Sequence, residues 1–444
     1  MLDPKFRRAN REDSDLLRVD YSDQNDFHHQ NLRDKFRIQA PIIVGGAFLV
    51  QIVLTIFILH EVRFPDFVVN SIVLTSATNL VALMNYRRLR LFPGSRRLAY
   101  LLPAFAVPYA IVVVGLLFVR PAYSVPLLTV GAFAAIALSW FFSLLNRNPN
   151  AAPLLIVPST RTGEMLKELP HIHHNVCKTG AELSMHRATI IVDLRDDLGP
   201  EWERGLAQAA LKGSTIYHVK QVWESLTGRV RIDHLSENSF GTLLPNSLYF
   251  SVKSAFDRIL GVCGLIVCAP IITLAAVAIM FESRGSAFFT QQRIGFRGEP
   301  FTIYKLRTML PDNAITDAKE AAITKVNDPR ITRLGRFLRA SRIDELPQFL
   351  NMTKGELSLI GPRPEATPLA EWYGSQMDFY DYRHVVRPGI TGWAQVNQGH
   401  VASDTAVFRK LQYDFYYIKY FSLWLDVLII CKTASVVIFR HGAK

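Results

Sequence analysis

RASRIDELPQFLNMTKGELSLIGPRPE, residues 339–365, is the stretch around which the rest of the chain is organised. An acidic pair, Asp344 and Glu345, lies within it. Three arginines flank the pair: Arg339, Arg342 and Arg363. Arginine side chains bind phosphate oxygens in a bidentate fashion. Adjacent carboxylates can hold a hard divalent cation and attack an electrophile. The combination indicates chemistry on a diphosphate.

The same spacing also fits a purely structural interpretation. Ser341 or Asp344 would cap a helix through LPQFLNMT, and the arginines would lie on its solvated face. Spacing alone leaves both interpretations open.

Longer strings on both sides of this stretch carry a family resemblance. They are QQRIGFRGEPFTIYKLRTM (291–309), DPRITRLGRFLRASRIDELPQFLN (328–351), KGELSLIGPRPE (354–365), RPGITGWAQVN (387–397) and YDFYYIKYFSLWLDVLIICKT (413–433). On these strings, residues 250–444 resemble the catalytic domain of the bacterial sugar transferases. These enzymes are polyprenyl-phosphate hexose-1-phosphate transferases, also called monotopic phosphoglycosyl transferases. The front half of the chain resembles the large form of the family only in plan.

The resemblance implies a two-step reaction at the acidic pair. Asp344 would attack the β-phosphorus of a UDP-hexose, expel UMP and form a phosphoryl-aspartate. Undecaprenyl phosphate would then take the sugar phosphate, which starts exopolysaccharide, capsule or O-antigen assembly. Glu345, together with Asp344, would hold Mg²⁺, which prefers one or two carboxylates plus phosphate oxygens. The large form favours glucose or galactose as the sugar, with an N-acetylhexosamine as the alternative.

Phosphate-binding residues are expected around this pair. Arg339 and Arg363 match the phosphate-binding arginines of the family. Lys305, Arg307 and Arg387 are further candidates, for which the alternative is surface charge or contact with lipid headgroups.

Composition indicates a membrane protein. Hydrophobic residues make up 49% of the 444 residues and charged residues only 20%, against about 25% charged in ordinary globular chains. The net charge of +12 is carried by basic residues beside apolar runs, which favours an anionic membrane face over nucleic acid as the partner.

Residues 38–146 are predicted to form a four-helix transmembrane domain after a disordered cytoplasmic arm, residues 1–37. Its apolar runs lie at about 40–60, 66–84, 98–119 and 122–145. The second run is rich in serine, threonine and asparagine and is expected to face neighbouring helices. Lysine and arginine gather in the arm and between the second and third runs, so both ends of the domain are expected in the cytoplasm.

Residues 147–248 alternate strand-like and helix-like segments, which predicts a small parallel α/β domain. Strands are expected at 153–157, 189–192 and 214–217, and helices at 164–169, 201–211 and 221–226. Large members of the family carry a Rossmann-like domain here. The turn PSTRTGEM lacks the glycines of a dinucleotide site, with Pro158 in place of a flexible glycine. Scaffolding or homodimerisation is therefore expected, and regulatory nucleotide binding is the alternative.

Residues 249–444 are predicted to form an α-rich mixed catalytic domain at the membrane. Its segment 253–282 is long and apolar enough to span a bilayer. Basic residues flank both ends and Pro270 lies in its middle, which favours a bent, re-entrant helix with both ends in the cytoplasm. The aromatic segment Tyr416–Phe439 predicts a C-terminal helix lying in the membrane interface. The whole is expected in the bacterial inner membrane, with the catalytic domain on the cytoplasmic face.

A second class of function is also compatible with the sequence. The chain could be a non-catalytic assembly or regulatory protein built on the same scaffold. The intact acidic pair with its arginines favours the enzyme.

Overall fold

The computed structural model describes residues 36–59, 64–89, 101–119, 122–145, 154–231, 247–310, 328–398 and 404–439, with short gaps at 170–171, 173 and 186–187. The arm predicted at 1–37 therefore lies almost entirely outside the described residues. Two compact units divide the chain, residues 1–228 and 229–444.

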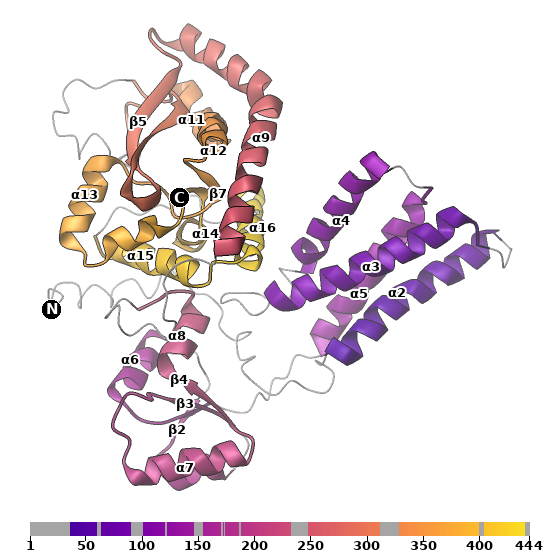
Figure 1. Ribbon diagram of the computed structural model, residues 1–444, viewed down its shortest axis with the longest axis vertical. Helices are drawn as coiled ribbons and strands as arrows, with labels where there is room; N and C mark the ends of the chain where they lie inside the picture. Colours follow the sequence, from indigo (N-terminus) through magenta and orange to yellow (C-terminus); the bar gives the residue numbers. More distant parts are fainter. Residues whose placement is uncertain are drawn as a thin grey trace. The chain divides into compact units, whose positions relative to one another are not determined.

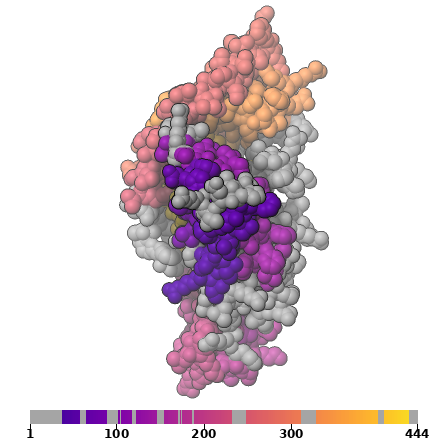
Figure 2. Space-filling view, turned by 90° about the vertical axis from the view of Figure 1, so that its right-hand side faces the viewer, coloured from indigo at the N-terminus to yellow at the C-terminus, as the bar shows by residue number. Residues whose placement is uncertain are grey.

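Four apolar helices begin the first unit, at the places that the apolar runs predict. They are α2 (Phe36–Leu59), α3 (Asp66–Leu89), α4 (Leu101–Val119) and α5 (Val125–Leu145). Three of them are long and apolar enough to cross a membrane, and α4 contains a shorter apolar core, 104–116. Figure 2 shows these helices in indigo to purple as a packed surface.

Helix α3 turns its polar side chains toward its neighbours, as predicted from its sequence. Ser71, Thr75 and Asn79 are fully buried. Asn79 accepts a hydrogen bond from the Tyr109 hydroxyl of α4 at 2.8 Å and donates to the Gly131 carbonyl of α5 at 3.2 Å. Because lipid offers no hydrogen-bond partners, these contacts tie the helices together.

A parallel sheet forms the second part of this unit. Its strands, β1 (Leu154–Ile156), β2 (His174–Val176), β3 (Thr189–Val192) and β4 (Thr215–His218), lie in the order β2-β1-β3-β4. Three of these strands match the prediction. Strand β2, HNV, is not predicted by the sequence because it is a largely exposed edge strand with two polar residues, unlike the apolar β1. The predicted helices are α6 (Thr160–Glu168), α7 (Pro200–Leu211) and α8 (Val219–Thr227).

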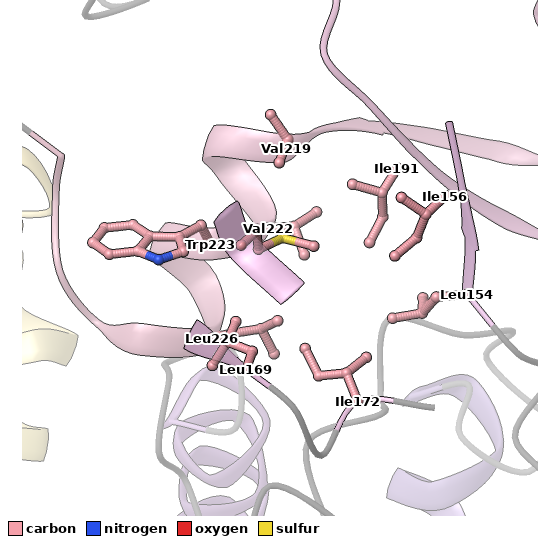
Figure 3. Packing of buried hydrophobic residues seen from close by; sticks show 10 residues of the cluster. Leu154, Ile156, Leu169, Ile172, Ile191, Val219, Val222, Trp223 and Leu226 are labelled. Carbon is pink, nitrogen blue, oxygen red and sulfur yellow. The ribbon is translucent and has the colours of Figure 1, made fainter. Parts of the chain in front are cut away.

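Both faces of this sheet are covered, which explains the continuous apolar run in β3. Helix α7 lies on one face, and α6 and α8 lie on the other (Figure 1). Figure 3 shows the core on the α6–α8 side, where Trp223, Val222 and Leu226 of α8 approach Leu154, Ile156 and Ile191 of the strands.

The second unit begins with a single helix of 36 residues, α9 (Ser247–Glu282), which contains Pro270. Figure 1 shows that this helix changes direction along its length. One face carries exposed apolar residues such as Ile266, Val267 and Leu274. The other face packs on the rest of the unit, which suits a helix that lies between lipid and protein.

Short elements complete the unit around α9. The antiparallel hairpin β5 (Phe288–Ile294) and β6 (Pro300–Leu306) follows it, and β7 (Ser358–Ile360) pairs in parallel with β8 (Gly389–Thr391). The helices are α11 (Arg333–Ala340), α12 (Phe349–Lys354), α13 (Thr367–Gln376), α14 (Trp393–Gln398), α15 (Asp404–Lys419) and α16 (Leu423–Phe439). Among the described residues this part is therefore α-rich and mixed, as predicted.

Candidate functional site

A tight turn presents the acidic pair between two helices. Helix α11 ends at Ala340, and Arg342 then adopts the left-handed conformation with φ 59°. The 3-10 helix η7 (Ile343–Gln348) follows and leads directly into α12. Ser341 therefore lies at the C-terminal end of a helix and Asp344 lies inside η7. The capping interpretation of these two residues is wrong, because the helix expected through LPQFLNMT is broken into two short pieces.

Glu345 lies in a cage of cations. Its Oε1 accepts from Lys305 Nζ at 3.0 Å and from Arg363 Nη2 at 2.9 Å, and Arg342 Nη1 lies 3.8 Å from its Oε2. Burial by itself would raise the pKa of Glu345, but Arg363, Lys305 and Arg342 outweigh it and hold this pKa well below the ordinary value. Glu345 is therefore a permanent carboxylate.

Asp344 differs from its neighbour in both contacts and charge. It is 8% exposed, and its Oδ1 has no hydrogen-bond partner in the described part of the chain. Burial and then the negative charge of Glu345 raise the pKa of Asp344. A buried carboxylate oxygen without a partner is costly. Because no group of the described residues occupies Asp344 Oδ1, this oxygen is available to an electrophile or a metal ion.

Strand β6 and the loop after β7 supply the cations of this cage. Lys305 lies near the end of β6, and burial together with Arg363 lowers its pKa to about 8. Arg363 follows β7, and the charge of Glu345 raises its pKa despite burial. The structure thus brings together four of the predicted residues, Asp344, Glu345, Lys305 and Arg363.

Arg339 reaches the same region from α11. Its Nε donates to Thr308 Oγ1 at 2.9 Å, and its Nη2 lies 3.0 Å from Met309 Sδ. The positive charge of Arg339 partly opposes the rise in the pKa of Asp344. Arg339 therefore lies within electrostatic range of the acidic pair.

Arg307 and Arg387 make other contacts. Arg307 donates to the carbonyls of Ser283 and Arg284, the two residues that follow α9, so it fixes the turn after that helix. Arg387 donates to Ser254 Oγ and lies over the Phe250 ring at 5.2 Å. These contacts join both arginines to α9 and to the two residues that follow it, and phosphate binding by either arginine stays a prediction.

The acidic pair offers oxygens that fit a magnesium ion. Among the described residues no group of three or more histidine, cysteine, aspartate or glutamate side chains lies close enough to hold a metal. Asp344 Oδ1 has no partner, and Glu345 Oε2 has only the distant Arg342. Mg²⁺ commonly uses one or two carboxylates and completes its shell with water and substrate phosphates. The donor set therefore fits Mg²⁺ in the presence of a diphosphate.

Sequence reasoning missed the residues that hold the Arg363 loop from behind. Arg383 Nη2 donates to the Arg363 carbonyl at 2.8 Å, and Arg293 Nη1 donates to the Pro364 carbonyl at 2.5 Å. Arg383 and Arg293 are 20 and 71 residues away from their partners in the sequence. No local spacing pattern therefore predicts these contacts. The one hint is that Arg383 follows closely on two tyrosines, in the string YDYRH.

A pocket of about 640 Å³ lies beside this loop, between the β5–β6 turn, α13 and the 3-10 helix η8 (Tyr380–Val385). Its lining includes Arg297, Glu371, Asp381 and His384. Burial lowers the pKa of His384 to about 3, so this histidine is neutral at physiological pH. None of the predicted site residues lines this pocket.

Comparisons with known proteins agree with the geometry. The family model for bacterial sugar transferases matches residues 248–440. A UDP-N-acetylgalactosamine-undecaprenyl-phosphate N-acetylgalactosaminephosphotransferase of Aeromonas hydrophila is 38% identical over 372 residues, 82% of this chain and 85% of that protein. A UDP-glucose:undecaprenyl-phosphate glucose-1-phosphate transferase of Xanthomonas campestris pv. campestris is 43% identical over 199 residues, 44% of this chain and 40% of that protein. An undecaprenyl-phosphate galactose phosphotransferase of Salmonella typhimurium is 36% identical over 205 residues, 43% and 41% of the two chains.

Proposed function

The chain belongs to the bacterial sugar transferase family, and on this basis we propose that it transfers a hexose 1-phosphate from a UDP-hexose to undecaprenyl phosphate and releases UMP. The observation that carries the proposal is the pairing of an unpartnered, buried Asp344 Oδ1 with a fully ionised Glu345 among cations. The names of the three relatives support the acceptor and the class of reaction.

Asp344 is the nucleophile in this proposal. Its Oδ1 attacks the β-phosphorus of the donor, a phosphorus–oxygen bond to UMP breaks, and UMP leaves with the electron pair. An oxygen of undecaprenyl phosphate then attacks the same phosphorus and releases the Asp344 carboxylate. A carboxylate is a weak nucleophile, so the charge of the diphosphate has to be neutralised around it.

The cations of the cage meet this need. Arg363 and Lys305 lie on Glu345 and present their remaining N–H groups where a diphosphate would bind. Glu345 orients them and stays ionised throughout. Mg²⁺, held by Asp344 and Glu345, would supply further neutralisation of the phosphate oxygens.

The reaction calls for a site at the cytoplasmic face of the inner membrane, because a soluble donor and a lipid acceptor have to meet there. Contacts at both ends of α9 support a re-entrant rather than a crossing helix. Near its start, Lys253 pairs with Asp426 of α16 at 2.7 Å. At its end, Glu282 accepts from the Leu334 amide of α11 at 3.0 Å. Both ends are therefore bound to one folded unit.

Asp344→Asn tests the proposal directly. Purified in detergent with Mg²⁺, UDP-hexose and undecaprenyl phosphate, the variant is expected to lose UMP release by a factor of 10³ or more (about 4 kcal/mol of barrier). Asp378→Asn, an exposed aspartate of the same unit, is the matched control and keeps its activity. UMP release by Asp344→Asn at the wild-type rate would remove the nucleophile, and an inactive wild type would favour the non-catalytic alternative.

The sugar is a separate question with two candidates. Glucose or galactose is the first, supported by relatives of those names. An N-acetylhexosamine is the second, because the relative matched over 82% of the chain is named for N-acetylgalactosamine. Measuring UMP from each UDP-sugar under one condition ranks them by kcat/KM.

A further inference from the structure

The backbone that carries Arg363 is held through its carbonyl groups. Pro362 and Pro364 flank the arginine and have no N–H group, so this loop cannot pair as an ordinary strand. Four successive carbonyls instead accept bonds from outside the loop. The donors to residues 362, 363, 364 and 365 are Gly389 N (2.9 Å), Arg383 Nη2 (2.8 Å), Arg293 Nη1 (2.5 Å) and Ile294 N (3.2 Å).

Arg383 is the donor with the most firmly fixed geometry. It is 3% exposed, and its Nη2 also donates to Asp414 Oδ2 of α15 at 2.9 Å, while its Nη1 donates to the Tyr380 hydroxyl at 2.8 Å. Asp414 is itself 1% exposed. The Nε of Arg383 has no hydrogen-bond partner among the residues that the structure describes, so its two Nη groups make all the hydrogen bonds given above for this buried guanidinium. Here the planar fork is aimed at the Arg363 peptide.

We propose that Arg383 is a positioning residue of the transferase reaction, which acts by fixing the main chain at Arg363 so that the Arg363 side chain meets both Glu345 and the donor diphosphate. This inference rests on the proposed function. A displacement of about 1 Å in a group that binds the reacting phosphates can cost a hundredfold in rate. Tying the loop to α15 prevents that displacement.

Arg383→Lys removes the planar, directional donors of the guanidinium but keeps its positive charge. Lysine keeps a positive charge for Asp414, but as a point charge it cannot hold the tyrosine, the aspartate and the carbonyl in fixed directions. We expect kcat for UMP release to fall at least tenfold. Tyr380→Phe is a milder second variant, since it removes a single partner of Arg383, and it is expected to lower kcat about twofold to fivefold.

A double-mutant cycle distinguishes positioning from loss of stability. If Arg383 acts through Arg363, then Arg383→Lys costs less than about twofold when Arg363→Lys is already present. Arg330→Lys is the control, because Arg330 pairs with Asp328 at 2.6 Å. Its effect is expected to be the same factor in both backgrounds. An equal, multiplicative loss for Arg383→Lys in both backgrounds would overturn the inference.

A second readout needs no catalysis. The backbone amides of Gly389 and Ile294 donate to the carbonyls of residues 362 and 365. If Arg383→Lys releases the main chain at Arg363, hydrogen exchange of these two amides, followed by mass spectrometry, should become faster, and it should stay unchanged in Arg330→Lys. Unchanged exchange in Arg383→Lys would contradict the inference even if the wild type released no UMP, an outcome that would refute the proposed function alone.

Discussion

Asp344 and Glu345 are adjacent in the chain, yet their environments shift their pKa values in opposite directions. The pKa of Asp344 rises and that of Glu345 falls. Pairs of titratable groups that are pushed apart in this way commonly divide two roles between them. Glu345 cannot easily become a nucleophile, because two cations occupy its Oε1. Asp344 has the open oxygen, so in the proposed reaction Asp344 would attack while Glu345 would hold the cations in place.

Titration of Lys305 is expected to make the activity depend on pH. Its pKa of about 8 means that it loses its proton, and Glu345 loses a partner, as the pH rises past 8. We expect kcat/KM for UMP release to fall about tenfold per pH unit above that point. Lys305→Arg should move this alkaline limb to higher pH, because arginine stays charged. A pH profile of both proteins from 6 to 10 checks the expectation.

The effect of Lys305 on stability has the opposite pH dependence to its effect on activity, so unfolding through Lys305 cannot explain the loss of activity. Between pH 8 and the ordinary lysine value of 10.5, the unfolded chain holds the Lys305 proton and the folded chain does not. The contribution of Lys305 to the free energy of unfolding therefore increases with pH over this window. A loss of activity that tracked a falling melting temperature would contradict the role of Lys305.

The residue scale also shows where sequence reasoning reached its limit. Asp344, Glu345 and Arg363 could be found because each lies in a string that has a chemical reason and a family resemblance. Arg307 is predicted as a phosphate-binding candidate from the same string as Lys305, two residues further on. Residues two apart share one face of a strand, but β6 ends at Leu306, and only contacts reveal that Arg307 turns to Ser283 and Arg284, just after α9.

At the scale of elements, the packing of α9 on α12 sets the position of the acidic pair. Gly261 and Gly264 of α9 allow a close approach, since a Cβ at Gly261 would lie 2.8 Å from the Thr353 amide nitrogen and one at Gly264 would lie 2.7 Å from the Phe349 ring. Helix α12 follows directly after η7. Any separation of the two helices would therefore move the catalytic turn.

Gly261→Ala is predicted to destabilise the second unit. An alanine in a helix interior gains about 1 kcal/mol over glycine, but overpacking against backbone costs about 1–3 kcal/mol. The steric term wins here because a backbone nitrogen cannot rotate away. We expect a lower apparent melting temperature in detergent, by a few degrees. Cys263→Ala, at an exposed position of the same helix, is the control, and an equal or higher stability for Gly261→Ala would contradict the close contact.

Helix and strand prediction succeeded where a segment is apolar throughout. The four apolar helices follow from the length of their apolar runs, and strand β3 follows from a short run of buried, β-branched residues. The break at Ile343–Gln348 did not follow, because Leu346, Phe349 and Met352 have a spacing that also fits one continuous helix. The left-handed Arg342 starts the 3-10 turn, and nothing in a single arginine signals that conformation.

At the scale of the whole molecule, α9 decides on which side of the membrane the catalytic unit lies. Its 36 residues would extend about 54 Å as a straight helix, more than enough to cross a hydrocarbon core of about 30 Å. A crossing helix, however, has its ends on opposite sides of the bilayer. Here Lys253 near one end and Glu282 at the other are both bound to the second unit, which favours a helix that enters and returns.

Two engineered cysteines test this topology. Leu211→Cys reports on the first unit, where Leu211 is 89% exposed, and Gln376→Cys reports on an exposed position of α13. Cys263 and Cys268 are replaced by serine in both proteins, while Cys177 and Cys431 are buried. With a re-entrant α9, a membrane-impermeant maleimide labels both positions in inverted inner-membrane vesicles and neither in intact spheroplasts. Labelling of Gln376→Cys alone in spheroplasts would mean that α9 crosses, and a cytosolic sugar donor could then not reach Asp344.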